Sequence, residues 1–448
     1  MTEAVIVLPG VMGSELYEGS ELIWPGNVTE LLLPYSKMEQ LLKPDLTVGD
    51  IIRNVSVSNQ YASLIAALQT CGFAENGDKP TLVVCPYDWR KDNALAADML
   101  AAKISKLRGV HGTDLVINLV AHSMGGLVSR YFLESGKYAE ATHPGFANVR
   151  RLITIGTPHR GAPLALHAAL GQIKRLFLNA DQVKELANRV EFPALYQLMP
   201  PPSEPFLWDA NAKARLAPKN PHDTEVATRL GLSRVNLDSS AAFHAALNVA
   251  NRPKGVDYFC FVGTRQGTIS NVQFDFSSDQ NDRPLIKETD DGGDGTVPSW
   301  SASFTGMQQL SVGGDHGSLY KPPEVLQTLA ALLGKPGVLA AMPTDRVRIS
   351  VRNEVVLPLR PESVILFLSS RKVLTAELVV RKLTSENGVE LPAAVEVNRV
   401  AVNYSGAPIE SMALQITTPR FAGAYEVDIQ VNNVSVAERA VTLLVQNP

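Results

Sequence analysis

Hydrophobic and polar positions follow two alternating patterns along the first three quarters of the chain. Near-continuous apolar runs, each closed by turn residues, are typical of parallel strands that are covered on both faces. Between the runs, residues 61–72 and 95–107 carry apolar positions at helical spacing. Strands that alternate with helices predict a doubly wound parallel sheet. The predicted strands are residues 4–10, 81–89, 115–123, 151–161 and 257–263.

Residues 162–256 interrupt this rhythm with several helical segments. Connections in such units are typically about 2–6 residues long, so the excess predicts a helical cap insertion. We expect it over the carboxyl edge of the sheet, where ligands of these folds bind. Its apolar, proline-rich stretch could simply pack as a wall of the cap. We predict instead that four of its residues line an acyl channel, namely Leu195, Tyr196, Leu198 and Met199.

The pattern changes after about residue 345 to short β-rich runs, with no long helical pattern between them. In one of these runs Tyr425, Val427 and Ile429 alternate with polar residues, as in a half-buried strand. The chain is therefore predicted to have an α/β domain over residues 1–340 and a small immunoglobulin-like β-sandwich over 345–448.

Composition narrows the class of protein. A chain of 448 residues with 45% apolar and 19% charged residues indicates a globular protein with more than one ordinary core. A net charge of −4 without a long basic run argues against nucleic-acid binding. The three cysteines are odd in number and widely spaced, which argues against a disulfide framework or a thiolate metal site. We expect buried, chemically silent side chains at Cys71, Cys85 and Cys260.

The chain start lacks the basic and apolar pattern of a signal peptide. No segment offers the roughly 18 apolar residues of a membrane span. The cytoplasm is the default expectation, and export by a signal-independent route stays open.

Ser123 lies at an abrupt joint between a predicted strand and a predicted helix. The segment Ala121-His122-Ser123-Met124-Gly125 is close to the G-x-S-x-G nucleophile elbow, with alanine at the first small position. Such a turn lifts the hydroxyl above the sheet edge, and the helix amino terminus adds positive potential. An ordinary strand-to-helix turn is the alternative. A serine hydroxyl is a poor nucleophile at neutral pH, so a nucleophilic role also needs a base and an acid.

The order nucleophile, acid, histidine guides the search for these partners. Of the eight histidines only His316 follows the last predicted strand, in a glycine-rich loop before a predicted closing helix. Asp294 precedes it in "DDGGDGTVP", where flanking glycines permit a tight turn that points the carboxylate inward. Asp290 and Asp291 are more typical of solvated charges. A calcium loop is a competing interpretation, but the regular ligand spacing is absent.

The oxyanion of an acyl-transfer reaction needs two backbone N–H donors. Met124, directly after the nucleophile, would supply one. The loop "LPGVMGSEL" after the first strand would supply the other, and we predict Val11, with Met12 as the neighbouring alternative. The candidate residues require no metal and no organic cofactor.

Several motifs together resemble the lecithin:cholesterol acyltransferase family. The motifs follow the family's order across about residues 4–334, and the β-rich tail lies outside the resemblance. The resemblance implies an α/β-hydrolase fold with a cap, maps Ser123, Asp294 and His316 onto the family's triad, and maps Val11 onto its oxyanion donor. The matching pieces are "LPGVMGSEL", "PYDWR", "AHSMGG", "GTPHRG", "GDGTVP" and "DHGSL".

The predicted reaction is acyl transfer from a lipid ester through an acyl-serine, as in a lipase or phospholipase. An O-acyltransferase that uses an alcohol acceptor would share the same residues, so the sequence leaves both open. A non-catalytic lipid- or protein-binding module is a third alternative. The expected partner is a lipid or other acyl ester at a membrane surface, and a protein partner for the tail stays open. No triad candidate lies in 345–448, so the tail is predicted to be dispensable for hydrolysis of a short soluble ester.

Overall fold

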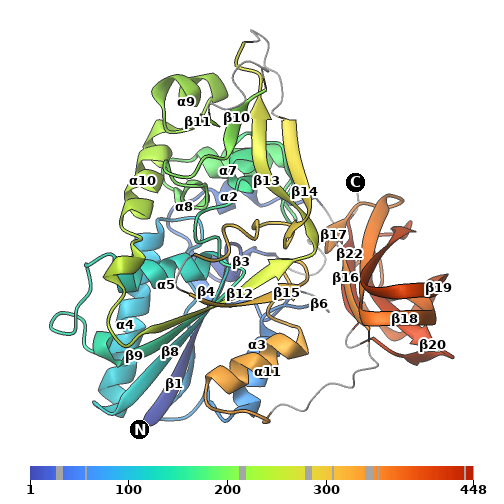
Figure 1. The fold of residues 1–448 in the computed structure, drawn as a ribbon, viewed down its shortest axis with the longest axis horizontal. Helices are drawn as coiled ribbons and strands as arrows, with labels where there is room; N and C mark the ends of the chain where they lie inside the picture. Colours follow the sequence, from blue (N-terminus) through green and yellow to red (C-terminus); the bar gives the residue numbers. More distant parts are fainter. Residues whose placement is uncertain are drawn as a thin grey trace.

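A six-stranded, all-parallel sheet forms the centre of the molecule in the computed structural model (Figure 1). Its order is β15 (Gln308–Gly313), β12 (Asp257–Thr264), β9 (Val149–Ile155), β8 (Leu115–His122), β1 (Thr2–Leu8) and β7 (Leu82–Val84). The structure describes residues 1–26, 34–55, 58–210, 218–277, 285–304, 307–338, 347–351, 353–437 and 440–446, with side chains left undescribed at 58–59, 285–291, 369–372 and 408–410.

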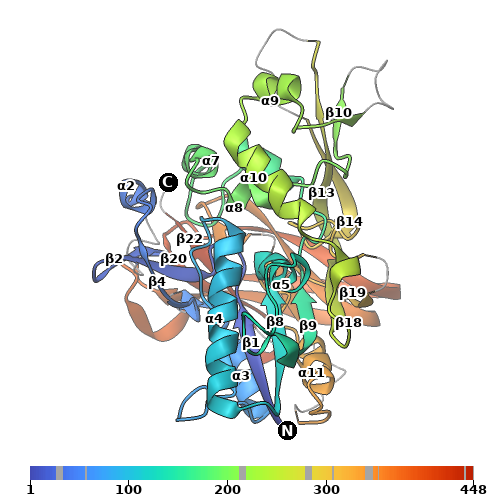
Figure 2. The same cartoon turned by 90° about the vertical axis from the view of Figure 1, so that its left-hand side faces the viewer.

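Helices cover both faces of this sheet (Figure 2). Ile6 and Leu8 of β1 belong to the core under α4 (Asn93–His111) and α5 (Met124–Glu134). Val5 and Val7 belong to the core under α3 (Ala62–Thr70) and α11 (Pro323–Leu332). Successive side chains of a strand point to opposite faces, so both sets must be apolar. The predicted doubly wound sheet is confirmed, and β15 is a strand that the apolar runs did not indicate.

The cap lies beyond the carboxyl edge of the sheet (Figure 1). Its strand β10 pairs in parallel with β13, which forms an antiparallel hairpin with β14. The cap therefore includes a small sheet and draws on residues after 256, beyond the boundary expected from the sequence. Its elements are α6 (Leu164–Ala169), α7 (Ala180–Asn188), α8 (Ala194–Gln197), β10 (Leu207–Asp209), β11 (Pro218–Lys219), α9 (Thr224–Leu230), α10 (Arg234–Ala245), β13 (Gln266–Phe274) and β14 (Leu285–Gly293).

Shorter elements complete the α/β part. An antiparallel sheet of β3, β2 and β4 follows the first strand of the chain, and β5 pairs with β6. These elements are β2 (Ser14–Glu18), β3 (Glu21–Trp24), α2 (Met38–Leu41), β4 (Thr47–Ile51), β5 (Asn54–Val55), β6 (Ser58–Asn59), and the 3-10 helices η1 (Phe146–Asn148) and η3 (Val249–Asn251).

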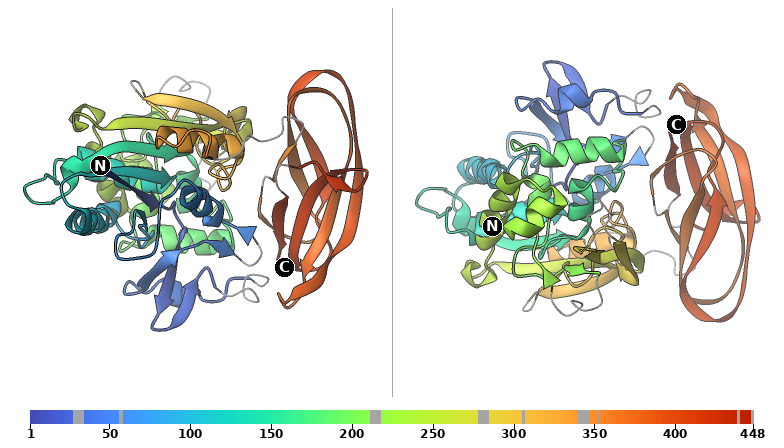
Figure 3. Two further views of the ribbon diagram at one scale, coloured as in Figure 1. Left: turned by 90° about the horizontal axis from the view of Figure 1, so that it is seen from below. Right: turned by 90° about the horizontal axis from the view of Figure 1, so that it is seen from above.

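The C-terminal region is rich in β structure, as predicted, and lies beside the α/β part (Figure 3). Its strands form one seven-stranded sheet around a separate apolar core. The runs "SVILFLS" and "TAELVVRKL" are separate in the sequence pattern but lie in one long strand, β18. Register shifts between residues 367 and 373 interrupt the alternation of this strand, which is why its sequence resembles two strands. The strands are β16 (Arg348–Val351), β17 (Val355–Val356), β18 (Pro361–Thr384), β19 (Glu390–Thr417), β20 (Gly423–Val431), β21 (Val434–Ser435) and β22 (Val441–Val445).

Within the described part of the chain, no helix combines the length and the apolar character that crossing a membrane requires.

Candidate active site

Ser123 occupies a strained turn between β8 and α5. Its φ of 53° and ψ of −125° are unusual for a residue with a side chain, as expected of a nucleophile elbow. The loop after β1 passes directly over it. A Cβ added at Gly10 would lie 2.8 Å from the Cβ of Ser123 and 3.3 Å from its Oγ. Only glycine fits there, so the backbone of this loop can approach the site where a substrate carbonyl would react.

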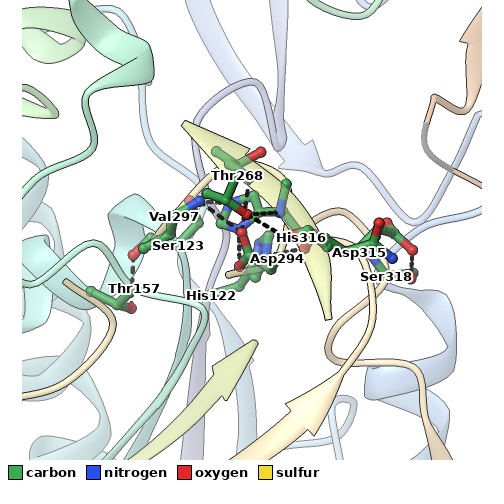
Figure 4. Close-up of polar contacts among 12 residues, drawn as sticks. His122, Ser123, Thr157, Thr268, Asp294, Val297, Asp315, His316 and Ser318 are labelled. Atoms are coloured by element: carbon green, nitrogen blue, oxygen red, sulfur yellow. Dashed lines mark hydrogen bonds and ion pairs between the residues drawn. The ribbon is translucent and has the colours of Figure 1, made fainter. Parts of the chain in front are cut away.

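Ser123, His316 and Asp294 form a continuous hydrogen-bonded chain (Figure 4). Ser123 Oγ is 2.8 Å from His316 Nε2, and His316 Nδ1 is 2.8 Å from Asp294 Oδ2. A carboxylate only accepts, so Nδ1 carries a hydrogen and Nε2 is left to accept the serine proton. In the sequence, Ser123 lies 193 positions and Asp294 lies 22 positions from His316, and the fold brings the three predicted residues into contact.

The second carboxylate oxygen of Asp294 is held by backbone donors. Oδ1 accepts the N–H groups of Thr296 at 3.0 Å and Val297 at 2.7 Å, and the residue is only 1% exposed. This is the inward-pointing tight turn that the flanking glycines suggested. Asp290 and Asp291 lie in strand β14 and not in a loop, and their side chains are outside the described part.

Two backbone amides beside Ser123 are open to a substrate. Met124 is the first residue of α5, so its N–H has no acceptor within the helix. Among the described residues, neither this amide nor that of Val11 donates a hydrogen bond within the protein. Val11 lines the cavity at Ser123, as does Met12, whose carbonyl accepts the indole N–H of Trp24 at 2.9 Å. The arrangement can stabilise an oxyanion.

Tyr61 ties the oxyanion loop to the histidine loop, a role that the sequence did not indicate. Its hydroxyl accepts the N–H of Gly10 at 2.9 Å and lies 2.7 Å from His122 Nδ1. His122 Nε2 is 3.0 Å from the carbonyl oxygen of His316. That carbonyl can only accept, so Nε2 carries the hydrogen and the Tyr61 hydroxyl donates to Nδ1. Burial, aided by nearby His316, holds the pKa of His122 well below its usual range, which keeps the ring neutral.

A cavity of about 650 Å³ opens at Ser123. The oxyanion loop, the triad and cap residues 173–177 line it, together with residues 353–357 and 360–362 of the C-terminal region. Arg175 brings a cation to this cavity, where it donates to Thr296 Oγ1 at 3.0 Å beside the Asp294 turn.

The four predicted channel residues lie elsewhere, so that prediction needs correction. None of them lines the cavity. Tyr196 and Met199 are buried in the core of the cap, and the Tyr196 hydroxyl donates to Asn188 Oδ1. Leu195 is buried in the larger core, and Leu198 packs between the two. Short helix α8 turns these side chains toward α10 and α7, so the stretch is a wall of the cap.

His159 and the cysteines are buried in the described part of the molecule. His159 is buried at 3% exposure, 3.1 Å from Thr154 Oγ1, and burial lowers its pKa well below the usual range. Burial also raises the pKa of both Cys85 and Cys260 to about 12, so these thiols stay protonated. In the described part of the chain, no cluster of three or more His, Cys, Asp or Glu could hold a metal ion. The cysteines are free and buried, as predicted.

The sequence is similar to known proteins of one family. Residues 51–230 match the family model described as "Lecithin:cholesterol acyltransferase". The chain is 23% identical to lecithin-cholesterol acyltransferase-like 4 of Arabidopsis thaliana, over 88% of this chain and 80% of that protein. It is 26% identical to lysosomal phospholipase A and acyltransferase of Bos taurus, over 57% of this chain and 61% of that protein.

Among solved structures, a chain of the Tle4-Tli4 complex superposes with a TM-score of 0.51 at 17% identity, over 76% of this chain and 99% of that one. This likeness concerns the fold.

Proposed function

We propose that the chain is a member of the lecithin:cholesterol acyltransferase family of the α/β-hydrolase superfamily, and that it transfers the acyl group of a lipid ester through Ser123. The observation that carries this proposal is the unbroken chain of hydrogen bonds from Ser123 through His316 to Asp294, at a strained elbow that faces a cavity. Isolated serines do not meet these conditions together.

The mechanism follows from the atoms at this site. His316 Nε2 takes the proton of Ser123 as Oγ attacks the ester carbonyl carbon. The N–H groups of Val11 and Met124 donate hydrogen bonds to the carbonyl oxygen and stabilise the negative charge that develops on it. His316 then protonates the leaving alcohol, and an acyl-serine remains. Asp294 holds the imidazole in the required tautomer and stabilises its charged form.

The second half of the reaction distinguishes a hydrolase from an acyltransferase. Water, deprotonated by His316, would release a fatty acid, and an alcohol in the same position would receive the acyl group. We propose a lipid-ester hydrolase, with O-acyl transfer to an alcohol as the alternative that the same residues permit. An ester presented at a membrane surface, a protein partner for residues 345–448 and a cytoplasmic location remain predictions from the sequence.

The division of the chain is part of the proposal. We assign the triad and the oxyanion donors to a catalytic domain over residues 1–340, with a cap from about 162, and treat 345–448 as a second β domain.

The test is to incubate defined phospholipids with the protein, with and without alcohol acceptors, and to identify the products by mass spectrometry. We expect free fatty acid from the parent, and a residual rate for Ser123→Ala below about one part in a thousand. A parent that makes only acylated alcohol would favour the acyltransferase. A Ser123→Ala protein with parental activity would show that the nucleophile lies elsewhere.

A further inference from the structure

The C-terminal region touches the loop that carries His316. Ser350 of β16 is buried, with 3% of its surface exposed, and its hydroxyl donates to Asp315 Oδ2 at 2.7 Å. Asp315 directly precedes His316, so a bond to its side chain acts on the backbone of the proposed catalytic base. The contact spans 35 positions and connects the β-rich region to the α/β part.

Asp315 depends on the donors around it. Its carboxylate also accepts the backbone N–H of Ser318 at 3.0 Å and the hydroxyl of Ser318 (Figure 4). Partial burial raises the pKa of Asp315, and the nearby Glu354 carboxylate raises it further, while Lys321 and the two serine hydroxyls act against this. A carboxylate with limited access to water is destabilised by the removal of each hydrogen-bond donor. Ser350 is the donor that comes from the other part of the chain.

Further contacts hold the same loop at both ends. At its start, a Cβ added to Gly313 would lie 2.8 Å from the ring of Phe367, so β18 packs directly on the end of β15. At its end, Lys321 Nζ lies 3.4 Å from Glu354 Oε1. Gln60 Nε2 donates to Glu354 Oε2 at 3.1 Å. The His316 loop is thus enclosed between the α/β sheet and the C-terminal region.

We propose that the C-terminal β region is a positioning element of the active site, in which Ser350 acts through Asp315 to hold His316 against Ser123. The inference rests on the proposed function of His316 as the base. It replaces the expectation that residues 345–448 are dispensable for hydrolysis of a short ester. A loop of glycines, "GGDHG", has little rigidity of its own, so its geometry must come from contacts with its neighbours.

Ser350→Ala in the full-length protein tests this inference. The assay uses a short, soluble ester, and rates are expressed per serine that reacts with a fluorophosphonate, so unfolded protein does not enter kcat. We expect kcat to fall about tenfold with KM unchanged, because a bond that orients the base is lost while the cavity stays intact. The rate of fluorophosphonate labelling should fall in parallel. Ser350→Thr, which keeps the hydroxyl, should restore both rates.

Two variants control for a merely structural effect. Ser363→Ala makes the same chemical change on β18, where the hydroxyl accepts a hydrogen bond from Gln415 at 3.4 Å. Glu426→Gln removes an ion pair with Arg381 inside the C-terminal sheet, between β20 and β18. Both should keep the parental kcat, whatever their melting temperature.

The outcomes separate the inference from the proposed function. Parental kcat and labelling rate in Ser350→Ala, or an equal loss in Glu426→Gln, would overturn the positioning role alone. A parent that neither reacts with the fluorophosphonate nor hydrolyses any ester would overturn the proposed function and, with it, this inference.

Discussion

The state of each reacting group is set by a few neighbouring atoms. Gly10 leaves room for the side chain of Ser123. Two backbone N–H groups donate to the carboxylate of Asp294 and orient it toward His316. Ser123, Asp294 and His316 could be predicted from the sequence, because each lies in a short turn next to glycines and the three follow a fixed order along the chain. Tyr61 could not be predicted, since it lies 61 positions from His122 on a helix start without a motif.

Asp294→Asn should lower kcat by about four orders of magnitude, because an amide at this position favours the wrong tautomer of His316. The matched variant Asp291→Asn lies three residues earlier and should keep the parental rate. Steady-state hydrolysis of a soluble ester by the two purified variants makes the comparison. A severe Asp291→Asn and a mild Asp294→Asn would reverse the assignment of the acid.

Tyr61→Phe removes the hydroxyl that joins Gly10 to His122 while keeping the ring that stacks on Tyr320, at 4.7 Å between centroids. We expect kcat to fall about tenfold, because both the oxyanion loop and His122 lose a buried partner. His122→Gln keeps an amide N–H that can donate to the His316 carbonyl in place of Nε2 and should retain more activity than His122→Leu. Equal rates for these two variants would argue that His122 only fills space.

At the scale of elements, strands of the central sheet were predictable and the packing of the cap was not. Buried parallel strands need apolar residues on both faces, so their sequences are distinctive. The stretch around α8 is equally apolar, yet its side chains face other cap helices and not the cavity. Apolar character alone does not distinguish a channel lining from a core. The same packing encloses His244 of α10, whose Nε2 lies 2.9 Å from the carbonyl oxygen of Gln197.

Burial lowers the pKa of His244 from its ordinary 6.5 to about 4. Since the unfolded chain binds this proton at higher pH than the folded chain, the stabilisation is present above pH 6.5 and is lost as the pH falls toward 4. The loss amounts to about 3 kcal/mol of unfolding free energy for this residue. His244→Gln, measured by urea unfolding across this range, should show a shallower decline than the parent. An unchanged slope would mean that folding does not lower the pKa of His244.

At the scale of the whole molecule, one cavity joins regions that are distant in the sequence. Cap residues 173–177 and C-terminal residues 353–357 and 360–362 line the same cavity as the triad. The sequence predicted two domains with separate roles, because no motif in the tail pointed to the active site. Contacts such as that between Ser350 and Asp315 arise from the docking of surfaces, which periodicity does not encode.

The apolar residues in the lining of this cavity predict a preference for long acyl chains. A chain that enters it gains roughly 0.8 kcal/mol for each buried CH₂ group, and an acetyl ester gains little of this. Ile173 lines the cavity from the cap, whereas Leu198 packs away from it. Ile173→Ser should therefore reduce the ratio of long-chain to acetyl kcat/KM by about tenfold. Leu198→Ser should lower the melting temperature and leave that ratio unchanged. The measurement is kcat/KM across a series of acyl lengths for the parent and both variants. A parental series that is flat, or that peaks at acetyl, would contradict the lipid assignment and indicate a generic esterase. A larger effect of Leu198→Ser than of Ile173→Ser on the ratio would indicate that the acyl chain binds against the cap residues around α8.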